Sequence, residues 1–206
     1  QTVEQINVGI AKNTVEEKPY PEVDFKGLKA LNRDVIGWIY VPDTEINYPI
    51  VHTTDNNYYL DHMVDRTENS AGSIFLDARN PSDFSDLHSI IYGHHMKNGS
   101  MFAALKGYKK QEFFDEHKGG YLMTEAGVYR IDFFTGHVAN VEEDAWQLDF
   151  VDSTEFDNWI KSLKDISAFK SDLTPEYGDQ IFTLSTCSYE FDDARFVLSG
   201  KLTKIE

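Results

Sequence analysis

Cysteine is scarce in this sequence, and its scarcity limits the chemistry that the chain can perform. Cys187 is the single cysteine among 206 residues. One thiol excludes an internal disulfide, and it also excludes any zinc or iron–sulfur site built from several thiolates. It leaves the redox compartment open, because secreted and cytosolic proteins can both do without disulfides.

Long apolar runs and an excess of positive charge are missing as well. No stretch approaches the roughly 18 consecutive apolar residues that a membrane-spanning helix needs. Lys and Arg number 19 against 35 Asp and Glu, so the formal net charge is −16. Nucleic-acid phosphates and anionic lipid head groups would be repelled by such a surface. The composition therefore argues against both partners, and it suits a cationic or amine-bearing partner better.

Aromatic residues are abundant, with 14 Phe, 11 Tyr and 3 Trp, and they favour strands and a packed core. From residue 35 onward, short segments with strand-like patterning are separated by turn residues. These segments span residues 35–41, 46–51, 73–76, 89–94, 121–124, 128–138, 180–187 and 195–203. Eight or so short strands with few helices predict a mainly β domain, either a closed barrel or a sandwich.

Helical patterning is confined to the start of the chain and to one later segment. Apolar spacing predicts a helix over residues 3–10, and Asp24 is a candidate N-cap for a second helix. The stretch 153–169 has the clearest apolar face, and Ser153 or Thr154 would cap it. We therefore expect one long helix at the periphery of the β domain and a helical appendage at the N-terminus.

Cys187 lies where a nucleophile could act, at the end of the predicted strand 180–187. If the strand that Arg195 opens is its antiparallel neighbour, Cys187 and Arg195 face each other with roughly 5 Å between backbones. A guanidinium there favours the thiolate and could stabilise an oxyanion. Taken alone, a single cysteine is more often an inert, buried residue. Arg195 alone is more often a solvated charge or a partner of Asp192 or Asp193.

A cysteine nucleophile generally needs a histidine, and the sequence has seven. His94 and His95 stand out because they stand at the end of an apolar strand, where Gly93 allows a close backbone approach. Adjacent residues of a strand point to opposite faces, so only one of the two histidines can meet Cys187. The pattern alone does not say which one.

Other catalytic patterns are missing from the sequence. It contains no His-Glu-x-x-His motif, no EF-hand loop and no phosphate-binding glycine loop after a strand. Ser185 does not stand in a Gly-x-Ser-x-Gly elbow, so a serine hydrolase has little support. We expect neither a metal nor a cofactor.

Three spaced elements together resemble the sortase family. The run Thr183-Leu184-Ser185-Thr186-Cys187, followed by Arg195, resembles the Thr-Leu-x-Thr-Cys … Arg signature of sortases. Tyr92-Gly93-His94 resembles their Gly-His strand end, and the order His, Cys, Arg is the same. The helix 153–169 and the helical N-terminal segment resemble additions found in class B sortases. No acidic cluster resembles the calcium site of class A members.

The resemblance implies a single-domain organisation: an eight-stranded sortase barrel over residues 36–206, with the helical appendage 1–35 packed on it. It implies a cysteine transpeptidase of a Gram-positive bacterium, held at the outer face of the cell membrane by an anchor upstream of Gln1. Cys187 would cleave a sorting signal after Thr and form a thioacyl enzyme. An amine of the peptidoglycan cross-bridge, or of its lipid-linked precursor, would then accept the surface protein.

The resemblance also implies roles for particular residues. It makes His94 the catalytic histidine, together with Cys187 and Arg195, and His95 becomes a neighbour that faces away. The residues that would bind the sorting peptide are Asn56, Leu60, Ser185 and Thr186.

Two alternatives stay open at this point. The first is a cysteine peptidase that passes the acyl group to water, which an added primary amine would not accelerate. The second is a non-catalytic acidic surface module in which Cys187 is buried. Rapid alkylation of Cys187 at neutral pH would argue against this second reading.

Overall fold

The computed structural model describes residues 11–12, 18–140, 144–187 and 194–206 of the chain. For residues 11, 12, 144 and 187 it describes the backbone alone.

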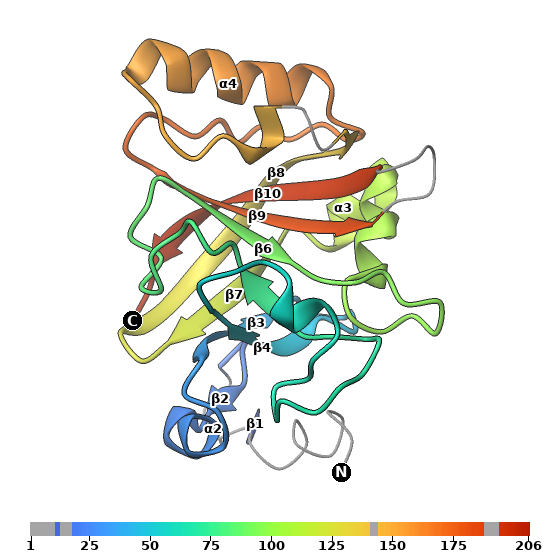
Figure 1. Ribbon diagram of the computed structural model, residues 1–206. Helices are drawn as coiled ribbons and strands as arrows, with labels where there is room; N and C mark the ends of the chain where they lie inside the picture. Colours follow the sequence, from blue (N-terminus) through green and yellow to red (C-terminus); the bar gives the residue numbers. More distant parts are fainter. Residues whose placement is uncertain (1–10, 13–17, 141–143, 188–193) are drawn as a thin grey trace.

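Eight strands close into a barrel (Figure 1). In barrel order they are β10 (Arg195–Lys204), β8 (Gly127–Ala139), β7 (Gly119–Thr124), β3 (Val35–Tyr40), β4 (Asn47–Val51), β5 (Ile74–Leu76), β6 (His88–Tyr92) and β9 (Gln180–Cys187). The β4–β5 and β6–β9 pairs are parallel, and the other neighbouring pairs are antiparallel. All the predicted strands are present, and the sheet is the closed barrel rather than the sandwich.

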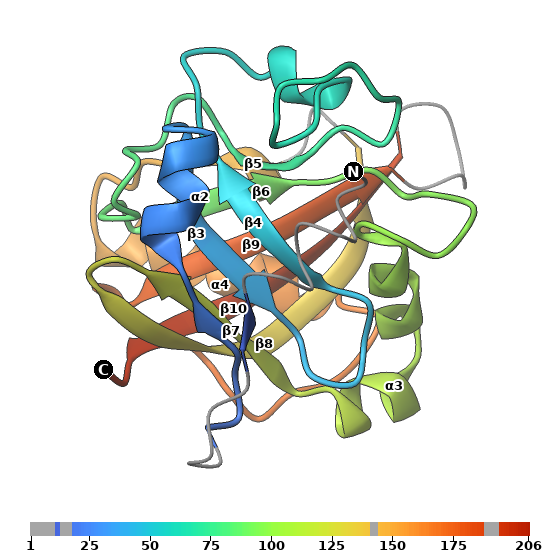
Figure 2. The same ribbon diagram turned by 90° about the horizontal axis from the view of Figure 1, so that it is seen from below.

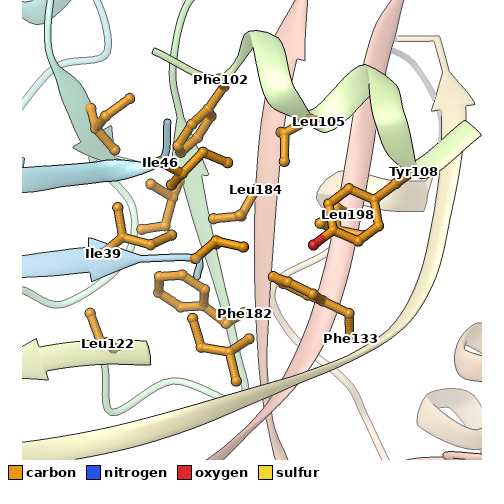
Figure 3. Packing of buried hydrophobic residues seen from close by; sticks show 14 of the residues in the cluster. Ile39, Ile46, Phe102, Leu105, Tyr108, Leu122, Phe133, Phe182, Leu184 and Leu198 are labelled. Carbon is orange, nitrogen blue, oxygen red and sulfur yellow. The ribbon is translucent and has the colours of Figure 1, made fainter. Parts of the chain in front are cut away.

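Apolar side chains at alternate strand positions fill the barrel. In β9, Phe182 and Leu184 are fully buried in this core, whereas Thr183 and Ser185 alternate with them along the strand. The segment η2 (Ala103–Lys109) adds further buried side chains to the same core, as Figure 3 shows. Most of β9 is thus committed to packing, and its last residues, Ser185 and Thr186, are the ones that line the cavity described below.

The helix α2 (Phe25–Leu31) begins where the sequence predicts. The Asp24 carboxylate accepts a hydrogen bond from the Gly27 backbone N–H at 2.9 Å, so Asp24 is the N-cap. Leu28 is fully buried in a cluster with Val35 and other residues of β3, which fixes α2 on the outside of the barrel. Figure 2 shows α2 and α3 (Gln111–Glu116) on different sides of the barrel.

Upstream of α2, the described backbone is extended rather than helical. The strands β1 (Ala11–Lys12) and β2 (Glu22–Val23) pair antiparallel. The helix predicted over residues 3–10 lies outside the described residues. The division of the chain after residue 35 stays a prediction.

The helix α4 (Ser153–Asp165) lies along the outside of the barrel (Figure 1), in a cluster with Phe134 of β8 and Ile181 of β9. Its buried face carries Phe156, Trp159, Ile160 and Leu163. The helix ends four residues before the predicted end at residue 169. After it, the Ala168 N–H donates to the Gly136 carbonyl of β8 at 2.7 Å, so the backbone turns back to the barrel.

The predicted cap of α4 is wrong by one or two residues. Asp152, rather than Ser153 or Thr154, is the N-cap, and its carboxylate accepts from the Glu155 N–H at 2.9 Å. The backbone of Asp152 is extended, which is the conformation that a capping residue needs.

Four short helical segments escaped prediction: η1 (Tyr58–Leu60), η2, α3 and η3 (Asp144–Trp146). Segments of three to seven residues contain too few helical turns to produce a clear apolar period. In the described part of the chain, no helix combines the length and the apolar character needed to cross a membrane.

Candidate active site

The β9–β10 ladder brings two of the predicted residues together. The antiparallel register pairs Cys187 with Arg195, as the sequence predicts, and β6, β9 and β10 lie side by side (Figure 1). The backbone of Cys187 is described and its side chain lies outside the described atoms. Cys187 ends β9 at the same edge of the barrel where β6 ends, because β6 and β9 are parallel neighbours.

A cavity of about 350 Å³ opens at this edge. Its lining residues are Asn56, Leu60, Phe75, Tyr92, Gly93, His94, Trp146, Ser185, Thr186 and Arg195. Six of these ten are predicted site residues, and they are all of the predicted ones whose side chains are described. The structure therefore gathers, in one cavity, residues that are up to 139 positions apart, from Asn56 to Arg195.

Gly93 guides the chain into this cavity. Its backbone N–H donates to the Ser185 carbonyl at 3.1 Å, which extends the β6–β9 ladder by one residue. A Cβ at Gly93 would lie 2.5 Å from the Ile74 side chain and 2.7 Å from the Phe102 ring. Only glycine fits there, and this close approach places the next residue, His94, at the cavity wall.

His94 is half-buried, and its Nε2 lies 2.7 Å from the backbone carbonyl oxygen of Leu60. A carbonyl oxygen can only accept, so Nε2 carries a proton and Nδ1 is the nitrogen that can gain or lose one. His95 does not line the cavity, and its backbone forms a bridge with Met101. Of the two adjacent histidines, only His94 can meet a ligand in this space.

Arg195 presents its guanidinium to the same space. One of its N–H groups donates to the Ala194 carbonyl at 3.1 Å. No carboxylate among the described residues pairs with it; Asp192 and Asp193, considered as partners above, lie outside the described residues. A positive charge that is not neutralised by a described neighbour is suited to an anionic or oxyanionic group in the cavity.

The hydroxyl groups of Ser185 and Thr186 are buried without a hydrogen-bond partner among the described residues. These side chains line the cavity although only 1% and 3% of their surfaces are exposed. Burying an unpaired hydroxyl costs free energy. Ser185 and Thr186 therefore add unpaired polar groups to the β9 side of the cavity wall.

The opposite wall is the segment around η1. The Asp55 carboxylate accepts backbone hydrogen bonds from Tyr58 and Asn57, which initiate η1 and lower the pKa of Asp55. Asn56 accepts from the Ala78 N–H through its Oδ1 at 2.7 Å, so its amide NH₂ is the end that can donate to a ligand. Leu60 is 41% exposed and lines the cavity, so its side chain suits an apolar contact with a ligand.

Sequence reasoning missed three aromatic residues of the cavity: Phe75, Tyr92 and Trp146. Tyr92 was visible as part of the Gly-His strand end, but only for its place in the motif. Trp146 follows a run of acidic residues, and a single aromatic residue at such a place could have indicated a binding residue. Phe75 offered no signal of a site residue, because in the sequence it is indistinguishable from the other apolar residues of a buried strand. Within the described chain, no three His, Cys, Asp or Glu side chains gather as metal ligands.

Fold and cavity together define a closed β-barrel with a cavity where the parallel strands β6 and β9 end. The sortase domain family matches residues 39–203, and the chain belongs to this family of cell-wall sorting transpeptidases.

The relatives are class B sortases. Sortase B of Listeria monocytogenes is 37% identical over 183 residues, covering 87% of this chain and 74% of that protein. A crystal structure of sortase B from B. anthracis matches with a TM-score of 0.83 and 36% identity, covering 98% of this chain and 93% of that one. A Staphylococcus aureus sortase B–substrate complex matches with a TM-score of 0.83 and 30% identity, covering 88% and 85%. The class B resemblance and the barrel are thereby confirmed.

Proposed function

We propose that this chain is a cysteine transpeptidase that cleaves a sorting motif of surface proteins after Thr and joins the protein to an amine of the peptidoglycan cross-bridge. The observation that carries the proposal is the single cavity lined by His94 and Arg195, next to the backbone position of Cys187. The related S. aureus sortase B forms a substrate complex, which supports a substrate-binding role for this chain.

The first half-reaction forms a thioacyl enzyme. The Cys187 thiolate attacks the carbonyl carbon of a Thr–Gly or Thr–Asn bond, and the carbonyl oxygen becomes an oxyanion that Arg195 stabilises. As the intermediate collapses, the C–N bond breaks and His94, as imidazolium, gives its Nδ1 proton to the leaving amine. The C-terminal part of the substrate then departs.

The second half-reaction transfers the acyl group. A primary amine attacks the thioester carbonyl, and neutral His94 accepts the proton that the amine loses. The C–S bond breaks, the thiolate returns and an amide bond remains. Only the fraction of molecules with Cys187 ionised and His94 protonated starts this cycle, so we expect slow turnover.

The peptide is proposed to contact both walls of the cavity. Ser185 and Thr186 offer unpaired hydroxyls, Asn56 offers its amide N–H, and Leu60 offers an apolar surface. The peptidoglycan amine or its lipid-linked precursor is the proposed acceptor, and the proposed location is the outer face of the cell membrane, with an N-terminal anchor. This location is the one where both proposed substrates occur.

The test is incubation with a small library of sorting-type peptides and a diamine, followed by mass spectrometry. We expect an amide between the Thr carboxyl and the diamine for the wild type, and none for Cys187→Ala folded to the same circular dichroism. Cleavage that yields only the free acid, with no acceleration by the diamine, would instead indicate a hydrolase. No cleavage, together with slow alkylation of Cys187, would indicate a non-catalytic module.

A further inference from the structure

A buried carboxylate lies directly behind the cavity, in the turn that follows β5. Asp77 is 1% exposed. It accepts from the backbone N–H of Arg79 at 2.9 Å, from two guanidinium N–H groups of Arg79 at 2.9 Å each, and from the Tyr92 hydroxyl at 2.8 Å. Burial opposes the charge of Asp77, but the bonds from Arg79 and Tyr92 outweigh it and lower its pKa to about 2. The group is therefore a fixed anion.

Tyr92 connects this anion to the cavity. Its ring lines the cavity and packs on Phe75 with the ring centroids 5.3 Å apart, while its hydroxyl donates to Asp77. Burial and the charge of Asp77 both raise the pKa of Tyr92, so the hydroxyl keeps its proton for that bond. Trp146 lines the same cavity. The polar end of Tyr92 is thereby fixed by Asp77, while its ring faces the cavity.

The same turn also holds the opposite wall. The backbone N–H of Ala78, between the two members of the ion pair, donates to the Oδ1 of Asn56 at 2.7 Å. Asn80 follows Arg79 in the same turn. Its side-chain amide donates to the His88 carbonyl at 2.8 Å and accepts from the Ile90 N–H at 3.0 Å, so the turn is hydrogen-bonded to β6. One turn thus determines the orientation of side chains on two sides of the cavity.

We propose that Asp77 is a positioning residue for the sorting peptide: it shapes the cavity before the peptide arrives, by holding the Tyr92 ring on one side and the turn that orients Asn56 on the other. A cavity ordered in advance loses less conformational freedom when its ligand binds, so this contribution falls on affinity rather than on bond cleavage. The inference rests on the proposed function, because it deepens the same site.

Two conservative variants test this role. Tyr92→Phe keeps the ring and removes only the donor, and Asp77→Asn keeps the shape and removes the charge. In each we expect the KM for a fluorogenic peptide with a Thr–Asn or Thr–Gly bond, assayed with a diamine, to rise about tenfold. The kcat should stay within about twofold. The double variant should lose little more than either single one, because both remove the same interaction.

A matched control is Tyr108→Phe. The Tyr108 hydroxyl is also buried and donates to the His117 carbonyl at 2.8 Å, but Tyr108 packs in the barrel core and does not line the cavity (Figure 3). The Tyr108→Phe variant should have a lower melting temperature than the wild type and the same KM. Peptide affinity can be measured from Trp fluorescence in the Cys187→Ala variant, which does not cleave the peptide. Adding Tyr92→Phe to this variant should weaken the affinity by about the factor by which Tyr92→Phe raises KM.

The outcomes are distinct. If the wild type is active and Tyr92→Phe has the KM of Tyr108→Phe, Asp77 serves only stability and the inference is overturned. If Asp77→Asn does not fold, the KM of Tyr92→Phe, compared with that of Tyr108→Phe, is the test of the proposal. If the wild type consumes no peptide with or without the diamine, the proposed function fails and this inference fails with it.

Discussion

His94 and His95 are neighbours in the sequence, yet only His94 lines the cavity. Adjacent residues at the end of a strand point to opposite sides, and the backbone of His95 forms a bridge with Met101. At the scale of the residue, chemical type is therefore less informative than backbone position. The same holds for Ser185 and Thr186, two ordinary hydroxyls that become unusual because they are buried without a partner among the described residues.

The histidine assignment gives the first prediction. His94→Ala should lower kcat/KM for peptide consumption by about 10²–10⁴-fold, the contribution typical of a general acid–base residue. His95→Ala, the adjacent control, should change it by no more than a few-fold. Both variants are assayed with the peptide and diamine after a check of folding by circular dichroism. An equal loss at the two positions would contradict the assignment.

The second prediction concerns the shape of a cation rather than its charge. Arg195→Lys should reduce kcat by about 10²–10³-fold, because lysine keeps the charge but not the planar fork of donors that would stabilise the oxyanion. Arg130→Lys is the control, since Arg130 pairs with Asp132 at 2.9 Å on an exposed part of β8. Near-normal turnover of Arg195→Lys would remove Arg195 from the oxyanion role.

At the scale of the element, the N-terminus of α4 is a place where the observed N-cap differs from the one that the sequence predicts. Asp152→Ala should lower the free energy of unfolding by about 1 kcal/mol, because the Glu155 N–H loses its capping acceptor. Ser153→Ala, a change at the cap predicted from the sequence, should cost clearly less. Urea unfolding measures both, and a larger loss at Ser153 would restore the sequence-based cap. Neither variant should alter peptide consumption, because neither residue lines the cavity.

The strands were predictable because each of them repeats a simple pattern. Those that form the β9–β10 ladder show it most clearly: the predicted β9 has the observed bounds, and the predicted facing of Cys187 and Arg195 is the observed register. The cap of α4 and the short segments η1 to η3 were not predictable in this way. Their conformations depend on single side-chain hydrogen bonds and on contacts with the barrel, which leave no period in the sequence.

The site residues that stand in sequence motifs were predictable, and those outside the motifs were not. His94, Arg195, Ser185 and Thr186 stand at motif positions, and the barrel brings them to one cavity. Phe75 and Trp146 come from elements that no motif connects to the strand of Cys187. Asp77 was hidden for another reason: nothing in a sequence says that one aspartate among many is buried and bonded to the back of the cavity.

At the scale of the whole molecule, one buried histidine joins several parts of the fold. His88 of β6 is fully buried; its Nδ1 lies 2.6 Å from the carbonyl of Gln147, next to Trp146, and its Nε2 lies 2.7 Å from the Thr183 hydroxyl of β9. Thr183 in turn lies 2.7 Å from the Ser199 hydroxyl of β10. Nδ1 must donate to the carbonyl, whereas the Thr183 hydroxyl can act as donor or acceptor toward Nε2. Full burial disfavours the charged ring, so His88 is neutral in the folded protein with Nε2 as the acceptor.

This neutral histidine makes stability depend on pH. Burial lowers the pKa of His88 to about 4 from 6.5, so between these values the unfolded chain binds a proton that the folded protein does not. Stability should therefore fall as pH decreases from 6.5 toward 4, with a loss on the order of 2 kcal/mol at pH 5 from this residue. The lowered pKa of Asp77, about 2 against 3.8, acts only in a more acidic range and does not obscure the effect.

Urea unfolding of the wild type at pH 7, 6 and 5 measures this dependence, and two histidine variants assign it. His88→Asn should be less stable than the wild type at pH 7, because it loses buried packing, but its stability should hardly change down to pH 5. His117→Asn should keep the wild-type dependence, since His117 caps α3 and is only partly buried. If the wild type were equally stable at pH 7 and pH 5, or if His88→Asn kept the full loss, His88 would not be the neutral link between β6, β9 and the Trp146 segment.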